Sequence, residues 1–186
     1  KMYGDAGVKI EPKIALLMCS AIISDTLIFR SPTCTEMDRE AGKALAEIAG
    51  INIKEHAHEM FFAGSNISEK TAKELFTGDF KRFSIGDTTF GIGQVSCMDG
   101  EELDQVKKKV MTYMKEQYKS LGVNMLYFML TDIIKPGTEL LCVGDGAMEL
   151  VERAFGVQGS DDVVYLPGVV SRKKQVVPEI MMEITQ

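Results

Sequence analysis

The chain has 186 residues, of which 45% are hydrophobic and 26% are charged, and its formal net charge is -6 at pH 7. A chain of this length can bury one substantial core, and its composition lies close to the average of globular domains, which excludes a disordered protein. The excess of acidic residues excludes general nucleic-acid binding, because a groove that follows phosphates usually makes the whole domain basic.

The sequence predicts neither a membrane span nor a disulfide framework. The longest apolar stretch, from Ile14 to Ile23 and interrupted only by Ser20, has about half the length that a bilayer crossing requires. The chain begins at a lysine and has no secretory leader pattern, so we expect it to be cut from a longer protein. The four cysteines are far apart and form no C-x-x-C pair, which favours a reducing, cytoplasmic compartment.

The first third of the chain is predicted to be a linker followed by helices. Residues 1–10 show no sustained period, which is typical of a linker or of the tail of a preceding domain. Pro12 suits the first turn of a buried helix that ends near Asp25. Two further helices are expected, from a Thr35 cap to Ala49 and from Lys54 to Ala63, each followed by a glycine.

The middle of the chain is predicted to change from a helix to a β-hairpin and back. Ser68 can cap a helix that runs through Phe76. Extended segments are expected over Phe80 to Ile85 and Thr88 to Ser96, joined by a turn at Asp87. The clearest amphipathic helix, with apolar residues spaced by threes and fours, follows over Glu101 to Leu121.

The last part of the chain reads as short buried strands that alternate with helices. We expect strands at Met125–Leu130, Leu140–Val143, Val163–Leu166 and Val169–Val170, and helices at Ala147–Phe155 and from Val177 onward. Such alternation predicts an α/β fold, a mixed β-sheet with helices on both faces, preceded by a helical linker layer. The expected division is residues 1–65 for that layer and 66–186 for the α/β domain.

Three cations in the run Ser171-Arg172-Lys173-Lys174-Gln175 directly follow the predicted last strands. A short charged run is most often a solvated strand end. The alternative is an anion site, because a guanidinium forks onto two phosphate oxygens while an ammonium acts as a point charge.

Other candidate residues have simpler interpretations when each is taken alone. Asp25 reads as a capping or hydrogen-bonded aspartate, because one carboxylate cannot hold a metal ion that prefers about six ligands. Lys81, between Phe80 and Phe83, reads as an exposed lysine. His56 and His58 point in different directions on a helix, so they cannot share a metal.

Long motifs nevertheless include Asp25 and the cationic run. Ser20-Ala21-Ile22-Ile23-Ser24-Asp25-Thr26-Leu27, Arg30-Ser31-Pro32-Thr33-Cys34-Thr35 and Gly168-Val169-Val170-Ser171-Arg172-Lys173-Lys174-Gln175-Val176-Val177-Pro178 resemble motifs of the family II inorganic pyrophosphatases of the DHH superfamily. The order and separation of the motifs also agree. The resemblance covers nearly the whole chain from about Glu11, and it corresponds to the C-terminal, DHH-associated domain of that family.

The resemblance implies a role for each candidate residue. Asp25 corresponds to a metal ligand, and Arg172 and Lys173 correspond to substrate-binding residues. Lys81 resembles a further substrate lysine. The implied reaction is hydrolysis of pyrophosphate to two phosphates by a metal-activated hydroxide, with Mn²⁺ as the cofactor and Co²⁺ or Mg²⁺ as alternatives.

The resemblance also implies which partners the chain binds and that the chain needs another domain for activity. Most metal ligands of the family belong to an N-terminal DHH domain whose motifs are absent from this sequence, so the chain is expected to be inactive alone. Pyrophosphate and that DHH domain are the expected partners, without nucleic acid or membrane, and a homodimer stays open. Two alternatives remain: a non-catalytic polyanion- or nucleotide-binding module, and an exopolyphosphatase of the DHH superfamily.

Overall fold

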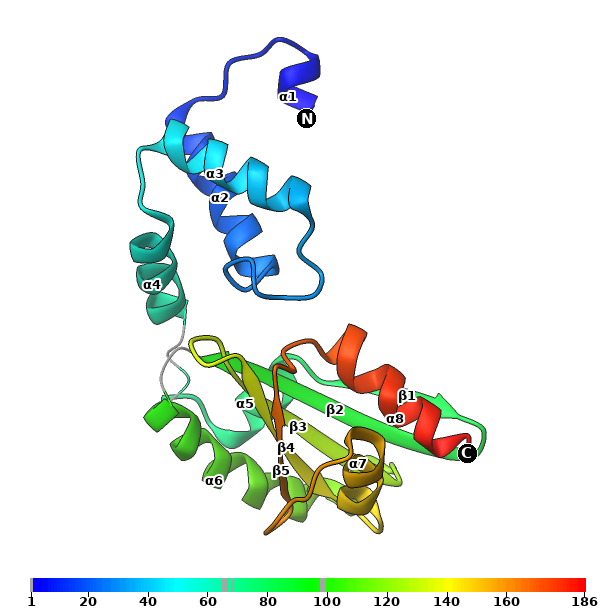
Figure 1. Ribbon diagram of the computed structural model, residues 1–186. Coiled ribbons are helices and arrows are strands. Elements are labelled where there is room, and N and C mark those ends of the chain that lie inside the picture. Colours follow the sequence, from blue (N-terminus) through cyan, green and yellow to red (C-terminus); the bar gives the residue numbers. More distant parts are fainter. Residues whose placement is uncertain (1, 65–66, 68, 98–99) are drawn as a thin grey trace. The chain divides into compact units, whose positions relative to one another are not determined.

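The computed structural model describes residues 2–64, 67, 69–97 and 100–186. The chain divides into two compact units, Lys1–Gly64 and Ser65–Gln186, and both are drawn in Figure 1. None of the helices in the described part of the chain has the length and hydropathy of a membrane-crossing segment.

The first unit contains helices only. They are α1 (Met2–Asp5), α2 (Pro12–Asp25), α3 (Glu36–Ala49) and α4 (Ile53–Gly64). The antiparallel pair α2 and α3 packs through small and aliphatic residues, and Ala57 of α4 joins the same core. The single turn α1 lies where the sequence predicted only a linker, because one turn of helix is too short to show a period.

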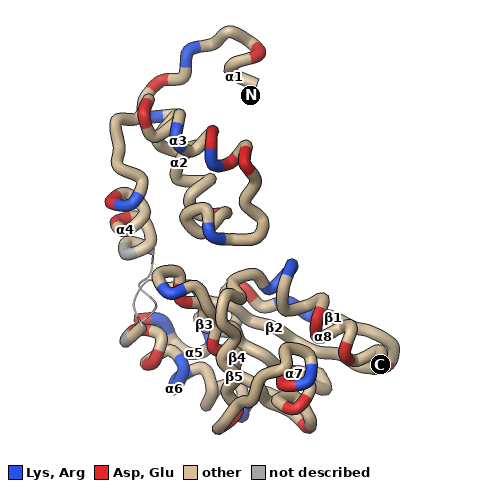
Figure 2. The backbone as a smooth tube through the Cα atoms, viewed as in Figure 1, with Lys and Arg blue, Asp and Glu red and all other residues tan. Residues whose placement is uncertain are grey.

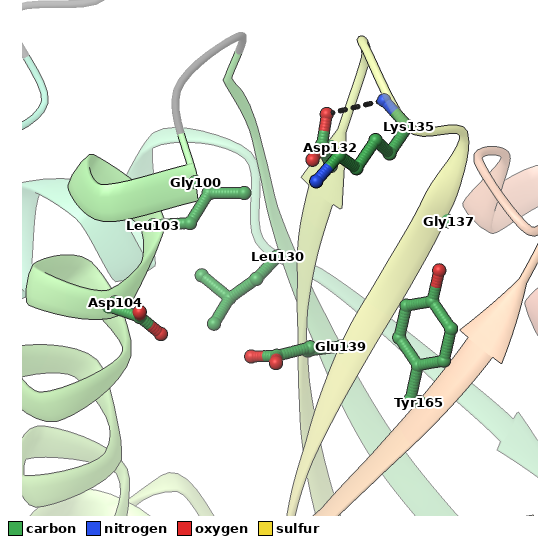
Figure 3. A pocket seen from close by; sticks show the side chains of 9 residues that line it. All are labelled: Gly100, Leu103, Asp104, Leu130, Asp132, Lys135, Gly137, Glu139 and Tyr165. Carbon is green, nitrogen blue, oxygen red and sulfur yellow. Dashed lines mark hydrogen bonds between the residues drawn. The ribbon is translucent and has the colours of Figure 1, made fainter.

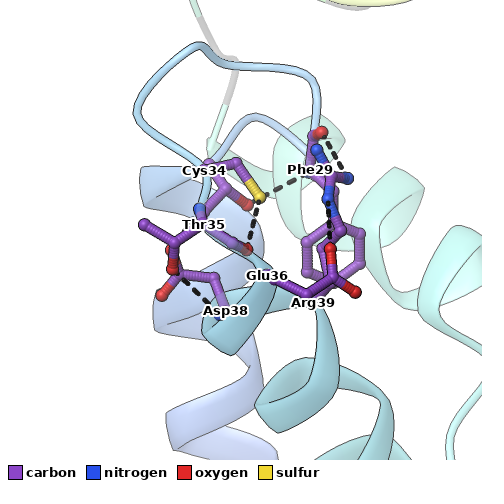
Figure 4. A network of polar contacts seen from close by, with 7 residues as sticks. Phe29, Cys34, Thr35, Glu36, Asp38 and Arg39 are labelled. Atoms are coloured by element: carbon purple, nitrogen blue, oxygen red, sulfur yellow. Dashed lines mark hydrogen bonds and ion pairs between the residues drawn. The ribbon is translucent and has the colours of Figure 1, made fainter.

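Helix α3 starts and ends at the residues that the sequence predicted. The Thr35 hydroxyl accepts a hydrogen bond from the Asp38 N–H at 3.3 Å, and the Asp38 carboxylate accepts one from the Thr35 N–H at 2.8 Å (Figure 4). The hydrogen bonds that the Asp38 carboxylate accepts from the Thr35 N–H and from the Thr35 hydroxyl, both at 2.8 Å, lower the pKa of Asp38. Gly50 ends the helix in the left-handed conformation, with φ 68°.

The second unit is built on one five-stranded sheet with the order β1-β2-β3-β4-β5. Its strands are β1 (Lys81–Ile85), β2 (Thr88–Cys97), β3 (Met125–Asp132), β4 (Gly137–Val143) and β5 (Val163–Pro167). Strands β2 and β3 run parallel, and the other neighbours are antiparallel. The prediction of a mixed sheet is confirmed.

Helices cover both faces of this sheet, as predicted (Figure 1). On one face lie α5 (Ala72–Gly78), α6 (Gly100–Gln117) and the short 3₁₀ helix η1 (Tyr118–Leu121), and on the other lie α7 (Ala147–Phe155) and α8 (Val177–Ile184). Strand β3 is buried between them, because alternate residues such as Tyr127 and Phe128 point into different cores.

Two local predictions need correction or replacement. The predicted cap Ser68 lies outside the described residues, and α5 is capped by Thr71 instead. The predicted strand at Val169–Val170 is wrong: Gly168, at φ 74°, turns the chain out of the sheet after Pro167. The chain then forms a π-helical turn, η2 (Arg172–Val176), which continues into α8.

Candidate anion-binding site

The cationic run forms the π-helical turn η2. Ser171 caps this turn, because its hydroxyl accepts a hydrogen bond from the Lys174 N–H at 3.3 Å. The Ser171 carbonyl accepts from the N–H groups of Gln175 at 2.9 Å and Val176 at 3.3 Å. Turns of this kind are rare and occur often at functional sites.

The side chain of Gln175 fixes the entry to η2. Its Oε1 accepts hydrogen bonds from the N–H groups of Val170 and Ser171, both at 3.0 Å. Its Nε2 donates to the carbonyl of Gly168 at 3.1 Å. One neutral amide therefore satisfies three backbone groups that the loss of strand pairing would leave unpaired.

The guanidinium of Arg172 is buried, with its side chain only 8% exposed. Its Nη1 donates to the carbonyl of Asp79 at 2.6 Å and to that of Ile92 at 3.2 Å. Its Nη2 donates to the Asp79 carboxylate at 2.7 Å. The interpretation of the run as a solvated strand end is therefore wrong for Arg172, because a buried charge requires such partners.

The same contacts bring Arg172 to the start of β1, where Lys81 lies. Asp79 precedes Lys81 by two residues, and Ile92 is the cross-strand partner of Lys81. Lys81 also shares the face of β1 that carries Phe83, which packs against the same core as α8. Two segments about ninety residues apart in sequence thus meet at one edge of the sheet.

The lysines at this place are exposed and available. Lys81 and Lys173 are both exposed, and within the described residues neither ammonium group forms an ion pair or a side-chain hydrogen bond. Lys173 directly follows Arg172 in η2, and Figure 2 shows basic residues in blue in the stretch that leads into α8. We call Lys81, Arg172 and Lys173 the cationic cluster; its charges suit a small polyanion despite the net charge of -6 of the chain.

Asp25 lies in the first unit, as the last residue of α2. Its side chain is exposed, and in the described part of the chain its carboxylate has no hydrogen-bond or ion-pair partner. A helix C-terminus carries partial negative charge, so an unpaired carboxylate there is electrostatically unfavourable. A bound cation would remove that cost.

A left-handed turn directly follows Asp25. Leu27, Ile28 and Phe29 have φ angles of 47°, 55° and 62°, a conformation that is costly for bulky side chains. The buried Thr26 holds this turn, because its hydroxyl donates to the Ile22 carbonyl at 2.6 Å and accepts from the Phe29 N–H at 3.1 Å. Figure 4 shows Arg39 beside it, whose guanidinium donates to the Phe29 carbonyl at 2.9 Å.

Asp25 alone does not make a metal site. Across residues 2–64, 67, 69–97 and 100–186, no group of three or more His, Cys, Asp or Glu side chains could hold a metal ion. His56 instead bonds to the Ser20 hydroxyl at 2.7 Å and thereby joins α4 to α2. As a carboxylate, Asp25 fits the role of one oxygen ligand to a hard divalent cation.

A separate hollow of about 490 Å³ lies on the α6 face of the sheet and contains none of the predicted site residues (Figure 3). Beside it, the Lys107 ammonium pairs with Glu139 at 2.6 Å and Asp104 at 3.0 Å. Partial burial alone would lower the pKa of Lys107, but its hydrogen bonds to Glu139 and Asp104 outweigh burial and raise it. Three carboxylates, those of Asp104, Asp132 and Glu139, line the hollow against one lysine, Lys135, so it does not suit a polyanion.

Sequence reasoning missed Asp79 and Gln175 as parts of the site. Nothing in the sequence around Asp79 indicates a partner at position 172, because the two positions are 93 residues apart. Gln175 belongs to the recognised motif, but its contacts with Val170 and Gly168 depend on the turn out of the sheet.

Comparison with known proteins shows the family of the chain. The DHHA2 domain matches residues 58–182. The "Probable manganese-dependent inorganic pyrophosphatase" of Clostridium acetobutylicum is 45% identical over 183 residues, which cover 98% of this chain and 59% of the relative. The "Cobalt-dependent inorganic pyrophosphatase" of Clostridium perfringens is 43% identical over 185 residues, which cover 100% of this chain and 34% of the relative.

A solved structure agrees with these matches. A crystal structure assigned to a family II inorganic pyrophosphatase of Methanococcus jannaschii superposes with a TM-score of 0.82 at 41% identity, covering 96% of this chain and 58% of that one. The chain thus spans between a third and three-fifths of the length of these relatives. The chain belongs to the DHHA2 domain family, and it is similar over almost its whole length to the family II inorganic pyrophosphatases.

Proposed function

We propose that this chain forms the substrate-binding part of a manganese-dependent family II inorganic pyrophosphatase, which hydrolyses pyrophosphate to two phosphates. Relatives named as manganese-dependent and cobalt-dependent pyrophosphatases support this, and Co²⁺ or Mg²⁺ are the alternative cofactors. Residues 1–65 would form the end of the N-terminal domain, a linker and a helical layer, and residues 66–186 the substrate-binding domain. The four free cysteines fit a cytoplasmic protein.

The observation that carries the proposal is the cationic cluster. Pyrophosphate has several negative charges that repel an incoming nucleophile, and preorganised cations neutralise them as charge develops on the leaving phosphate. In this cluster the two lysines are free to move onto phosphate oxygens, whereas Arg172 is fixed by contacts with Asp79 and Ile92.

Asp25 would supply one oxygen ligand to a divalent metal. When bound, such a metal makes water nucleophilic near neutral pH and polarises phosphoryl oxygens. The remaining ligands would come from an N-terminal DHH domain, so this chain alone would not hydrolyse pyrophosphate. Thr26 and Arg39 would keep the Asp25 carboxylate in place by holding the strained turn after it.

Steady-state kinetics of the complete enzyme with Mn²⁺ test the proposal. We expect Arg172→Ala and Lys173→Ala each to lower kcat/KM for pyrophosphate by roughly a hundredfold, because removal of one preorganised charge donor typically has this effect. Lys81→Ala should lower kcat/KM in the same direction.

Two matched controls make this experiment specific. Arg82→Ala removes a cation from the opposite face of β1, and Lys108→Ala removes an exposed lysine from α6. Both control variants should retain wild-type kinetics. Wild-type kcat/KM in Arg172→Ala and Lys173→Ala would show that the cluster does not bind the substrate.

A further inference from the structure

Asp79 stands beside the cationic cluster although its charge opposes that of the substrate. We propose that Asp79 is a positioning residue: it fixes the guanidinium of Arg172 so that one edge of this group faces the phosphate. The inference rests on the proposed function, and it adds a residue to the substrate site that does not itself contact the substrate.

Two different atoms of Asp79 hold the Nη1–Nη2 edge of the guanidinium. Its main-chain carbonyl accepts from Nη1 at 2.6 Å and its carboxylate accepts from Nη2 at 2.7 Å. The Ile92 carbonyl takes the second N–H of Nη1 at 3.2 Å. These three acceptors lie on two elements, the end of α5 and strand β2, so the guanidinium plane is fixed in position and in rotation.

This arrangement leaves two of the five N–H groups of Arg172 without a protein partner in the described residues: the Nε–H and one N–H of Nη2. They lie on the same edge of the planar group, and such an edge forms two parallel hydrogen bonds with a phosphate. A free arginine side chain would lose rotamer entropy on binding, whereas the held one has already lost it.

The charge and exposure of Asp79 agree with a role in holding Arg172 while Arg172 binds the phosphate. Its side chain is 50% exposed while that of Arg172 is 8% exposed, so the carboxylate retains hydration and the guanidinium does not. An ion pair with the full charge of a carboxylate satisfies the buried cation before any anion arrives. Removal of the Asp79 carboxylate would leave only the two main-chain carbonyls at Nη1, so Nη2 would lose its acceptor and its counter-charge and the guanidinium plane would be less firmly fixed. Within the described residues the two lysines have no comparable anchor.

A double-mutant cycle in the complete enzyme tests the inference. Asp79→Ala should lower kcat/KM for pyrophosphate roughly ten- to a hundredfold, the range of coupling between residues in contact. In the Arg172→Ala background the same substitution should have no further effect, because Asp79 acts only through Arg172. Asp79→Asn retains an acceptor for Nη2 but not the charge, so it should recover only part of the lost kcat/KM.

The control is Asp87→Ala, which removes the same charge from the turn of the same hairpin, beyond the last residue of β1. It should leave kcat/KM unchanged. Thermal unfolding of every variant identifies any that fail to fold. If Asp79→Ala does not fold, Asp79→Leu, which keeps a branched side chain but offers no acceptor, replaces it in the cycle.

Three results would overturn the inference. An increase of kcat/KM in Asp79→Ala would mean that the carboxylate competes with the substrate for Arg172. An equal loss in the wild-type and Arg172→Ala backgrounds would mean that Asp79 has only a structural role. An Arg172→Ala enzyme with wild-type kinetics would contradict the proposed function of the cluster itself. The first two results, in contrast, would leave that function intact and contradict only the role of Asp79.

Discussion

The amide of Gln175 shows how one side chain can set the conformation of a functional turn. It accepts from two backbone N–H groups and donates to one carbonyl. Only an amide offers both capacities on adjacent atoms without charge. A carboxylate of the same shape could accept, but it would place a negative charge next to Arg172 and Lys173.

We therefore expect Gln175→Glu to raise the KM of the complete enzyme for pyrophosphate, by roughly tenfold for one repelling charge close to a bound anion. The lost donor to the Gly168 carbonyl should loosen the turn as well. Gln158→Glu, the same change at an exposed position before β5, is the matched control. A KM that shifts equally in both variants would contradict a specific role for Gln175.

Single residues were predicted where a motif carried them. Arg172, Lys173 and Asp25 were identified from long sequence motifs and Lys81 from a short one, none of them from composition, and their roles stay predictions. Asp79 could not be found in this way, because its contact with Arg172 joins positions 79 and 172 and depends on how η2 packs against β1 and β2.

At the scale of elements, local signals decided most boundaries. Helices α2 and α7 begin and end close to the predicted residues, since Pro12 and the glycines around α7 act within one turn. The predicted strand at Val169–Val170 was wrong for a tertiary reason. The Val169 carbonyl accepts from the Thr138 hydroxyl at 2.6 Å, and the Val170 N–H is taken by Gln175.

Helix α5 depends on a capping box with a measurable pH dependence. Hydrogen bonds from the Thr71 N–H and hydroxyl lower the pKa of Glu74 below its usual range. The resulting stabilisation is present above the pKa of Glu74 in the unfolded chain, and it is lost as the pH falls through the lower pKa of the folded state. We expect Glu74→Gln to lower Tm near neutral pH, and this difference from the wild type should shrink below the usual pKa of glutamate.

Thermal unfolding between pH 7 and acidic pH checks this expectation. Glu116→Gln, at an exposed position of α6 whose side chain forms no hydrogen bond or ion pair within the described residues, controls for the loss of one negative charge. A Tm difference for Glu74→Gln that does not change with pH would contradict a contribution from the ionised cap.

Strand β2 needs a glycine at position 93, because the ring of Phe128 on the neighbouring strand lies close to the backbone there. A Cβ at Gly93 would lie 2.5 Å from Cδ2 of Phe128 and 3.3 Å from the Phe76 carbonyl oxygen, and Phe128 is fully buried. We expect Gly93→Ala to lower the free energy of unfolding by about 1–3 kcal/mol, the usual cost of overpacking a core. Denaturant unfolding measures it.

The control for this substitution is Gly78→Ala, at the end of α5, where a Cβ would meet no atom within 4 Å. It should be neutral or slightly stabilising, because alanine is the better helix former. Equal effects of the two substitutions would contradict a packing role for Gly93.

For the whole molecule, the alternation of helices and strands was sufficient to predict the α/β class and the mixed sheet covered on both faces. The metal site could not be predicted from this chain, because only Asp25 is a candidate ligand and the described residues contain no cluster around it. The charge of the molecule is distributed unevenly. The chain is acidic overall, yet the cationic cluster has one guanidinium held by Asp79 and two ammonium groups that have no partner among the described residues.

Protection of lysines by a substrate analogue tests the central claim most directly. The complete enzyme with Mn²⁺ is treated with acetic anhydride, with and without methylenediphosphonate, and acetylation of each lysine is followed by mass spectrometry. We expect the analogue to slow acetylation of Lys81 and Lys173 and to leave Lys108, on α6, unchanged. Equal acetylation of Lys81 and Lys173 with and without a saturating analogue would contradict a substrate-binding role for this chain.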